Sequence, residues 1–268
     1  MKDLTFIIPT RIETEDRLRN IISSVSYLLR HFPAKVMVKE VGPQKTFFFR
    51  AIPEIQKYVS DRNLIYFYEE TQEPLFCKSK VLNDLIVAAD TKFVANYDAD
   101  CILPLTSYHQ AYAILESDQA DVVYPYGCGV YQWKAEYNMQ VYEEFVSTLD
   151  YRILDKRKTL SNSTIGWTQF VNRQKYIDSY MMNENFISWG CEDDEFYFRM
   201  STLGNRIARL DDYVYHLEHS RTHNSWFSSP KFNDNWNLWN KIKTFDRNQL
   251  IQYYEGQEYL KTRGKQLA

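Results

Sequence analysis

Short apolar runs alternate with longer amphipathic stretches through the first hundred residues, and this alternation limits the fold more than any other feature. Residues 4–8 predict a buried strand that ends at Pro9. Apolar residues then recur at helical spacing over 18–32, with Thr14 as the expected N-cap. Further strands are expected over 36–38, 64–68 and 93–97, and a helix over 78–89. Strands that alternate with helices indicate an α/β fold with a mostly parallel sheet flanked by helices.

The second half of the chain has a less regular pattern. Strands are expected over 121–126, 169–171, 206–210 and 213–217, and helices over 138–154 and 192–203, with Gly204 as the last C-cap. From Ser225 the sequence is rich in Trp, Phe and Asn and then becomes helical in pattern. Because no repeat or low-complexity linker divides the chain, we expect one α/β domain over 1–224. A largely helical, aromatic-rich C-terminal extension over 225–268 is expected to pack on it.

Composition argues against several classes of protein. The net charge of -3 argues against a nucleic-acid binder, which usually carries a basic excess. The four cysteines form no CxxC pair, so they predict neither structural zinc nor a disulfide framework and are typical of a reducing cytosol. The first apolar run is too short for a signal peptide, and no run approaches the ~20 apolar residues that span a bilayer. We therefore expect a cytoplasmic protein, and binding to the inner membrane surface stays open.

Two carboxylates, Asp98 and Asp100, follow the predicted strand over 93–97. Ligands of open α/β sheets bind beyond the carboxyl ends of the strands, and Arg11 lies just after another such end. Mg²⁺ and Mn²⁺ prefer oxygen ligands and commonly bridge carboxylates to a diphosphate. The pair therefore predicts a metal site, with an ordinary capping turn as the alternative.

His216 and His219 form a second group of candidate metal ligands. Imidazole suits Mn²⁺ better than Mg²⁺, so a set of Asp and His favours manganese. Residues three apart on a regular strand point to opposite faces, so both histidines reach one ion only if the strand bends or ends between them. We expect His219 to bind the metal, while His216 is either a further ligand or a core histidine.

Arg11 and Lys78 are the cations expected to face a nucleotide diphosphate. Each follows or opens a predicted element at the expected cleft, and a solvated surface charge is the alternative role. Neither GxGxxG nor GxxxxGK[ST] occurs in the sequence, which argues against a dinucleotide cofactor and against P-loop chemistry.

Four consecutive carboxylates follow an aromatic residue and a glycine in the segment SWGCEDDEF, residues 188–196. Acidic side chains favour the first turn of a helix, because the unpaired N–H groups there carry partial positive charge. The alternative is a sugar site, in which one carboxylate is a general base and its neighbours bind hydroxyls. Both interpretations stay open from the run alone.

Six segments, in this order, resemble those of GT-A fold glycosyltransferases. They are IIPTR (7–11), FCKSKVLND (76–84), YDADCILP (97–104), IGWTQFVNR (165–173), SWGCEDDEFYFR (188–199) and HLEHSR (216–221). The resemblance covers about residues 4–224 and is greatest to the galactosyltransferase and N-acetylgalactosaminyltransferase group. WGxEDDEF and HSR are its most specific parts. It implies a GT-A, Rossmann-like fold.

The resemblance also implies roles for individual residues. The catalytic base would be Asp193, and the expected metal ligands are Asp100 and His219, with His216 and Asp98 as further candidates. The expected acceptor contacts are Trp189, Glu192 and Asp194, and Glu195 is expected to be an ordinary first-turn residue. The expected nucleotide-sugar contacts are Pro9, Arg11, Glu40, Phe76, Lys78, Asp98, Gly166 and Trp189.

Three positions depart from the family pattern. Lys78 replaces an arginine and supplies a point charge without a bidentate fork. Cys191 stands where the family has a glycine, which affects the freedom of the backbone there. His216 stands where β-1,4-galactosyltransferases use a methionine ligand, so the resemblance leaves its role open.

These roles predict a Mn²⁺- or Mg²⁺-dependent enzyme that moves galactose or N-acetylgalactosamine from a UDP-sugar to a saccharide hydroxyl. Asp193 would act as the base of an inverting reaction, and the small residues Ser163 and Thr164 would leave room for an N-acetyl group. A retaining N-acetylgalactosaminyltransferase shares the acidic motif and is the first alternative. A sugar nucleotidyltransferase and a non-catalytic sugar-binding scaffold are the others.

The extension over 225–268 has two interpretations. Its aromatic residues at mixed helical spacing favour packing on the core of the domain. Docking to a membrane surface or a partner chain is the alternative, since a lipid-linked acceptor would need it. By analogy with enzymes that lack an anchor, we expect a role in bacterial surface-polysaccharide synthesis. The sequence does not indicate an oligomeric state.

Overall fold

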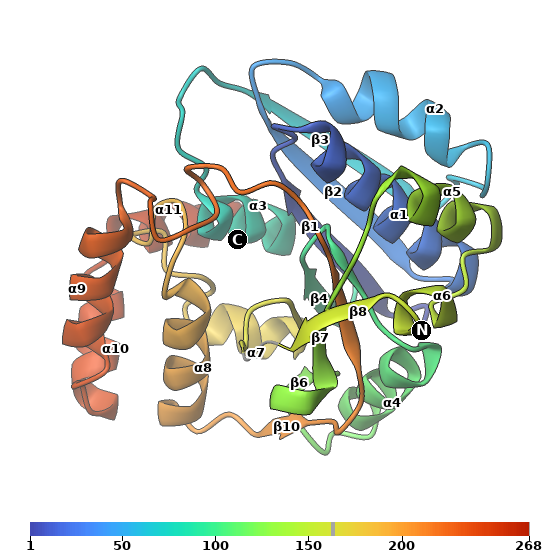
Figure 1. Ribbon diagram of the computed structural model, residues 1–268. Coiled ribbons are helices and arrows are strands. Elements are labelled where there is room, and N and C mark those ends of the chain that lie inside the picture. Colours follow the sequence, from blue (N-terminus) through green and yellow to red (C-terminus); the bar gives the residue numbers. More distant parts are fainter. Residues whose placement is uncertain (162–163, 268) are drawn as a thin grey trace.

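The computed structural model describes residues 1–161 and 164–267 of the chain. Its main sheet has seven strands: β1 (Leu4–Thr10), β2 (Lys35–Gly42), β3 (Leu64–Glu70), β4 (Phe93–Tyr97), β6 (Val122–Tyr124), β9 (Thr168–Asn172) and β10 (Ile207–Arg209). Their order across the sheet is β10-β6-β9-β4-β1-β2-β3 (Figure 1). β9 runs antiparallel to its two neighbours, and the other pairs in this sheet are parallel. The predicted α/β fold with a mostly parallel sheet is confirmed.

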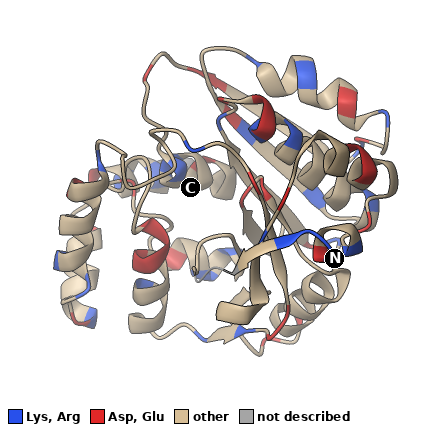
Figure 2. Cartoon of the chain, viewed as in Figure 1, with Lys and Arg blue, Asp and Glu red and all other residues tan. Residues whose placement is uncertain are grey.

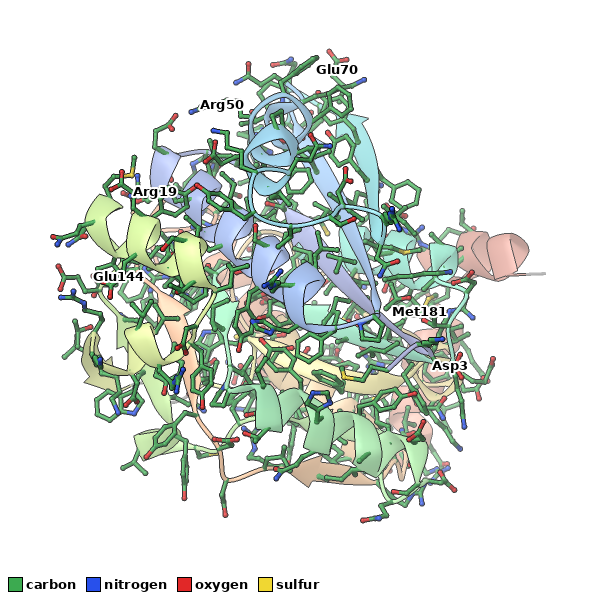
Figure 3. The ribbon with its side chains drawn as sticks, turned by 90° about the vertical axis from the view of Figure 1, so that its right-hand side faces the viewer. Asp3, Arg19, Arg50, Glu70, Glu144 and Met181 are labelled. Atoms are coloured by element: carbon green, nitrogen blue, oxygen red, sulfur yellow. The ribbon has the colours of Figure 1, made fainter. Side chains whose placement is uncertain are left out.

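Helices cover both faces of this sheet. The helices before the extension are α1 (Glu15–His31), α2 (Ile52–Ile55), α3 (Lys78–Ala88), α4 (Leu105–Glu116), α5 (Met139–Thr148), α6 (Arg152–Asp155), α7 (Arg173–Asp178) and α8 (Glu192–Thr202), with a π-helical turn η1 (Phe47–Ala51) and a 3₁₀ turn η2 (Gly129–Tyr131). α1 and α4 share one face (Figure 3). On it, the rings of Tyr27 and Phe32 contact Tyr108. α3, α7 and α8 lie on the opposite face (Figure 1).

A second sheet of four short strands was not expected from the sequence. It contains β5 (Cys101–Ile102), β7 (Gln132–Ala135), β8 (Lys158–Ser161) and β11 (Val214–Leu217), in the order β5-β11-β7-β8. β11 pairs antiparallel with β5, with His216 opposite Cys101, and the Leu217 N–H donates to the Asp100 carbonyl at 2.8 Å. This pairing brings the histidine cluster next to the two aspartates, although more than a hundred residues separate them in sequence.

The single helix expected over 138–154 is wrong, because the chain forms α5 and α6 instead. Leu149, directly after α5, has a left-handed backbone with φ of 53°. A residue in that conformation cannot continue a right-handed helix. Periodicity in the sequence does not report the sign of one φ angle.

The C-terminal extension contains α9 (Phe232–Ile242), α10 (Arg247–Glu255) and α11 (Glu258–Leu267). A small core of Phe186, Ile242, Leu250 and Tyr254 joins it to the rest of the chain. Its division from residues 1–224 as a separate unit stays a prediction. Among the described residues, no helix has both the length and the apolar character needed to cross a bilayer.

Glu195 is not an ordinary first-turn residue, and that expectation is wrong. Its side chain is fully buried and accepts a hydrogen bond from Arg199 Nε at 2.8 Å. The Tyr254 hydroxyl donates to the same carboxylate, and the Arg199 guanidinium lies 4.8 Å from the Tyr254 ring centre. A buried charge needs such partners, so the contacts of Tyr254 with this ion pair tie the extension to the helix that carries the acidic run.

Candidate active site

A cavity of about 430 Å³ opens beyond the carboxyl ends of β1 and β4. Its walls come from the ends of these strands, from the first residues of α1, α3 and α8, and from the loop after β11. It brings together most of the predicted residues: Pro9, Arg11, Phe76, Lys78, Asp98, Asp100, Gly166, Trp189, Glu192, Asp193, His216 and His219. Residues far apart in the sequence therefore share one site.

Glu40 and Asp194 are the two predicted residues that the structure does not bring to this cavity. Glu40 is buried beneath it, where its carboxylate accepts hydrogen bonds from the Tyr66 hydroxyl at 2.6 Å and from the Phe47 N–H at 3.0 Å. Asp194 is exposed on α8, outside the residues that line the cavity. Successive residues of a helix point about 100° apart, so α8 presents Glu192 and Asp193 to the cavity and turns Asp194 away.

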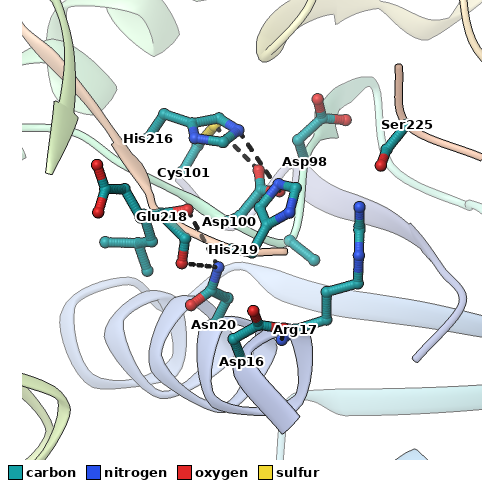
Figure 4. Close-up of polar contacts among 12 residues, drawn as sticks. Asp16, Arg17, Asn20, Asp98, Asp100, Cys101, His216, Glu218, His219 and Ser225 are labelled. Atoms are coloured by element: carbon teal, nitrogen blue, oxygen red, sulfur yellow. Dashed lines mark hydrogen bonds and ion pairs between the residues drawn. The ribbon is translucent and has the colours of Figure 1, made fainter. Parts of the chain in front are cut away.

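Asp100, His216 and His219 form a cluster suited to a divalent cation. One ligand atom from each lies within 4.8 Å of the others. Asp100 Oδ2 is 3.1 Å from His219 Nε2 and 3.6 Å from His216 Nε2 (Figure 4). β11 ends at Leu217, between the two histidines, which meets the condition under which both can face one ion.

The protonation of the histidines also suits a metal. His219 Nδ1 lies 2.9 Å from the Ser220 carbonyl, to which it can donate, and this tautomer leaves a lone pair on Nε2. Burial lowers the pKa of His216 to about 4 despite the charge of Asp100, so that imidazole is neutral near pH 7. Three electron-pair donors that face one another are well placed to hold a cation, and a mixed oxygen and nitrogen set suits Mn²⁺.

Asp98 is not part of this cluster. Its carboxylate accepts from Lys78 Nζ at 2.9 Å, and Lys78 Nζ lies 3.6 Å from Asp193 Oδ2. Burial by itself would lower the pKa of Lys78, but the charges of Asp193, Asp98 and Glu192 raise it well above its usual value. Burial also raises the pKa of Asp98, and the neighbouring Asp100 and Asp193 add to this effect. Lys78 therefore bridges Asp98 and the candidate base, Asp193.

The acidic run begins α8, and its carboxylates gather in the first turn of that helix (Figure 2). Glu192 is buried and accepts from the Gly190 N–H at 3.0 Å. Burial, followed by the charge of Asp193, raises the pKa of Glu192. Two carboxylates of the run, those of Glu192 and Asp193, thus line the cavity at a helix N-terminus, so the two interpretations of the run are compatible.

Gly166 lies directly against Asp193. A Cβ atom added at Gly166 would collide with Asp193 Oδ2, so glycine is the residue that leaves this carboxylate its place. We expect Gly166→Ala to displace Asp193 and to lower turnover by about 100-fold, the scale for a misplaced catalytic group, with little change in thermal unfolding. The matched control is Gly42→Ala, because a Cβ there has no atom within 4 Å. Wild-type turnover in Gly166→Ala would contradict the prediction that activity needs Asp193 in the position that Gly166 leaves open.

The loop before α8 has an unusual backbone. Ser188, Gly190 and Cys191 have φ of 61°, 122° and 68°. Cys191 is thus left-handed at the position where the resembling family has glycine. A cysteine in this conformation carries a steric cost that glycine would not.

We expect Cys191→Gly to leave the free energy of unfolding unchanged or up to about 1 kcal/mol higher, because the roughly 1–2 kcal/mol penalty of a left-handed side chain offsets the flexibility of glycine. Cys191→Val should lower it by about 1–2 kcal/mol, since β-branching is poorly tolerated at positive φ. Urea unfolding of the three proteins measures this. Equal stability of the glycine and valine variants would contradict the strained conformation.

Trp189 lies in an aromatic group to which the C-terminal extension contributes. Its ring centre is 4.8 Å from that of Phe227, 5.7 Å from Phe232 and 6.1 Å from Trp226. Trp226 and Phe227 also line the cavity and are 41% and 58% exposed. Exposed aromatic rings beside carboxylates offer a surface on which a sugar ring can stack.

Sequence reasoning missed several cavity residues, namely Glu13, Arg17, Asn20, Trp167, Arg221, Asn224, Ser225, Trp226 and Phe227. Arg17 had a usable signal, because it stands in the first turn of the helix that follows β1. Ser225, Trp226 and Phe227 of the extension gave no signal in the sequence, because their place in the cavity wall depends on the tertiary packing of the extension. Thr164 lines the cavity, whereas Ser163 lies outside the described residues.

Residues 156–220 match the family model described as the N-terminal domain of galactosyltransferase. This range contains Gly166, the acidic run and both histidines of the cluster formed by Asp100, His216 and His219, called the metal-type cluster below. Comparison with curated protein sequences gives no match.

Solved structures of glycosyltransferases resemble the whole chain in fold. S. aureus TarS 1-349 in complex with UDP-GlcNAc has a TM-score of 0.61 at 18% identity, over 100% of this chain and 71% of that one. GalNAc-T7 with UDP, GalNAc and Mn²⁺ has a TM-score of 0.60 at 13% identity, over 98% of this chain and 54% of that one. The mannosyltransferase PcManGT from Pyrobaculum calidifontis, in complex with GDP-Man and Mn²⁺, has a TM-score of 0.54 at 14% identity, over 99% of this chain and 72% of that one. The chain therefore has the GT-A fold of glycosyltransferases.

Proposed function

We propose that this protein is a metal-dependent glycosyltransferase that moves a hexose or N-acetylhexosamine from a UDP-sugar to a saccharide hydroxyl. One observation carries the proposal: a metal-type cluster of Asp100, His216 and His219 shares a single cavity with the carboxylates of Asp193 and Glu192. The partial match to a galactosyltransferase domain supports the same reaction class. Galactose and N-acetylgalactosamine are the donor sugars that we favour.

The reaction uses the chain's residues as follows. Asp193 takes the proton of the acceptor hydroxyl while that oxygen bonds to the anomeric carbon of the donor. The bond from the anomeric carbon to the β-phosphate oxygen breaks, and its electron pair leaves with UDP. A divalent ion held by Asp100, His216 and His219 would supply positive charge for the departing diphosphate.

The other cavity residues orient the substrates and balance charge. Lys78 offsets the repulsion between Asp98 and Asp193, which keeps two carboxylates close in a half-buried site. Trp189 and Glu192 face the acceptor, with the ring against its apolar face and the carboxylate against a hydroxyl. Pro9, Arg11 and Phe76 line the donor side.

A screen of nucleotide sugars, with and without Mn²⁺, tests this function. We expect UDP release that depends on a saccharide acceptor and on the metal. Pyrophosphate release from UTP and a sugar 1-phosphate would instead identify a nucleotidyltransferase. Sugar binding without donor consumption would identify a scaffold.

The stereochemical outcome belongs to the same proposal. We favour inversion, and the Asp193 carboxylate supports it because it lines the cavity, where a base can reach an incoming hydroxyl. Proton NMR of the first product distinguishes the anomers, and an anomer identical to that of the donor would establish the retaining alternative.

The biological setting that we propose is bacterial surface-polysaccharide synthesis on a lipid-linked acceptor. The exposed rings of Trp226, Phe227 and Trp236 support a contact of the extension with a membrane surface. Retention of the protein on liposomes of anionic lipid tests this contact. If liposomes do not retain the protein, the membrane part of the proposal is wrong and the transferase part is unaffected.

A further inference from the structure

The cations that the sequence assigned to the diphosphate already have partners. Lys78 is paired with two carboxylates. Arg11 donates to the Glu73 carbonyl at 2.7 Å and lies 3.6 Å from Glu13. A leaving diphosphate carries several negative charges, so the site needs a cation whose hydrogen-bonding groups are still available.

Arg17 has this property. Its Nε and Nη2 atoms are buried and lack a hydrogen-bond partner within residues 1–161 and 164–267. The side chain lines the cavity and extends from α1 past His219 towards Asp98 and Ser225 (Figure 4). Leaving two buried N–H groups of a guanidinium unpaired is unfavourable, so this geometry anticipates a ligand with oxygen acceptors.

The surroundings of Arg17 favour an anion over a neutral sugar hydroxyl. Arg17 lies in the first turn of a 17-residue helix, whose N-terminal end carries partial positive charge. A second guanidinium, that of Arg221, lines the same cavity, where it lies 4.7 Å from the Trp226 ring centre and donates to the Ser225 carbonyl at 3.2 Å. Arginine binds phosphate through a planar fork, which an unpaired Nε and Nη2 provide.

We propose that Arg17 binds the diphosphate of the nucleotide donor, beside the metal-type cluster, and holds it as the leaving group departs. This inference rests on the proposed transferase function and adds a positioning residue to it. Arg17 thus takes the part that the sequence assigned to Lys78, while Lys78 serves the carboxylates.

Calorimetric titration with UDP and with uridine, in the presence of Mn²⁺, tests the proposal on the whole chain. We expect Arg17→Gln to weaken UDP binding by about 10- to 100-fold, the range for losing charge-assisted hydrogen bonds, and to change uridine binding less than twofold. Arg17→Lys keeps the charge but not the fork, so its UDP affinity should be intermediate. Arg30→Gln, at the exposed last turn of the same helix, is the matched control and should bind both like wild type.

The outcomes separate this inference from the function on which it rests. If Arg17→Gln binds UDP as tightly as wild type, while the wild-type protein transfers sugar, the role of Arg17 is overturned and the proposed function stands. Equal losses for UDP and uridine also overturn it, because Arg17 would then only shape the cavity. If the wild-type protein binds no nucleotide diphosphate and releases none from any nucleotide sugar, the proposed function itself is wrong. If Arg17→Gln shows no thermal unfolding transition, the variant is not folded. The UDP affinity of Arg17→Lys relative to wild type then tests the role of Arg17, and an unchanged affinity overturns it.

Discussion

Asp193→Asn should lower sugar transfer by about 10²- to 10⁴-fold, the range that general bases contribute, and leave UDP binding intact. The amide keeps the shape of the side chain but cannot accept the proton of the acceptor hydroxyl. Asp193 faces the cavity beside Lys78 and Gly166 and lies away from the metal-type cluster, so donor binding should survive. UDP release in the screen measures transfer, and titration with UDP measures binding.

Asp194→Asn is the matched control for this experiment, because it removes one carboxylate from the next position of the same helix. Asp194 is exposed and does not line the cavity, so the variant should retain at least about half of wild-type turnover, as expected for a surface substitution. Near-wild-type turnover of Asp193→Asn would mean that another group is the base. Equal losses in both variants would restore the acceptor contact that the resemblance implied for Asp194.

Asp100→Asn, His216→Ala and His219→Ala should each weaken Mn²⁺ binding by at least about 10- to 100-fold, since even outer-shell changes at metal sites reach that size. Each substitution removes one of the three donor atoms that meet within 4.8 Å. Turnover at a fixed, low Mn²⁺ concentration should fall in parallel and recover partly at high concentration. Electron paramagnetic resonance of free Mn²⁺ measures the affinity directly.

His109→Gln is the control for the metal experiment, because His109 is exposed on α4 and does not line the cavity. It should bind Mn²⁺ like wild type. The result for His216→Ala also resolves what the sequence left open. If that variant binds Mn²⁺ like wild type, His216 is a core histidine, and only Asp100 and His219 of the three residues bind the metal.

The predictable part of this fold came from local pattern. β1, β4 and the first helix appear where alternating apolar runs placed them, since buried strands and amphipathic helices each leave a periodic trace. The strand expected over 213–217 appears as β11, whereas β5 leaves little trace, because two residues show no period. Their pairing nevertheless sets the distance between Asp100 and His216.

Motifs predicted which residues gather in the cavity better than they predicted what each residue does there. Lys78 was expected at the diphosphate, which stays a prediction, and the structure pairs it with Asp98 and Asp193. Glu195 was expected to be an ordinary helix residue and is half of a buried ion pair. The partners of a charged side chain come from distant segments, so its charge does not indicate which group it will meet.

From the sequence alone one can read the α/β class, the chemistry of the acidic and histidine groups and the end of the sheet at which they lie. These follow from local periodicity and from the rule that ligands of open α/β sheets bind beyond the carboxyl ends of the strands. The left-handed backbone of Cys191 and the aromatic wall from the extension depend on contacts between segments far apart in the chain. So do the buried Nε and Nη2 of Arg17, which find no hydrogen-bond partner in the part of the chain that the structure describes. Such contacts arise when packing and burial fix which groups face one another, and those constraints act on the folded chain as a whole.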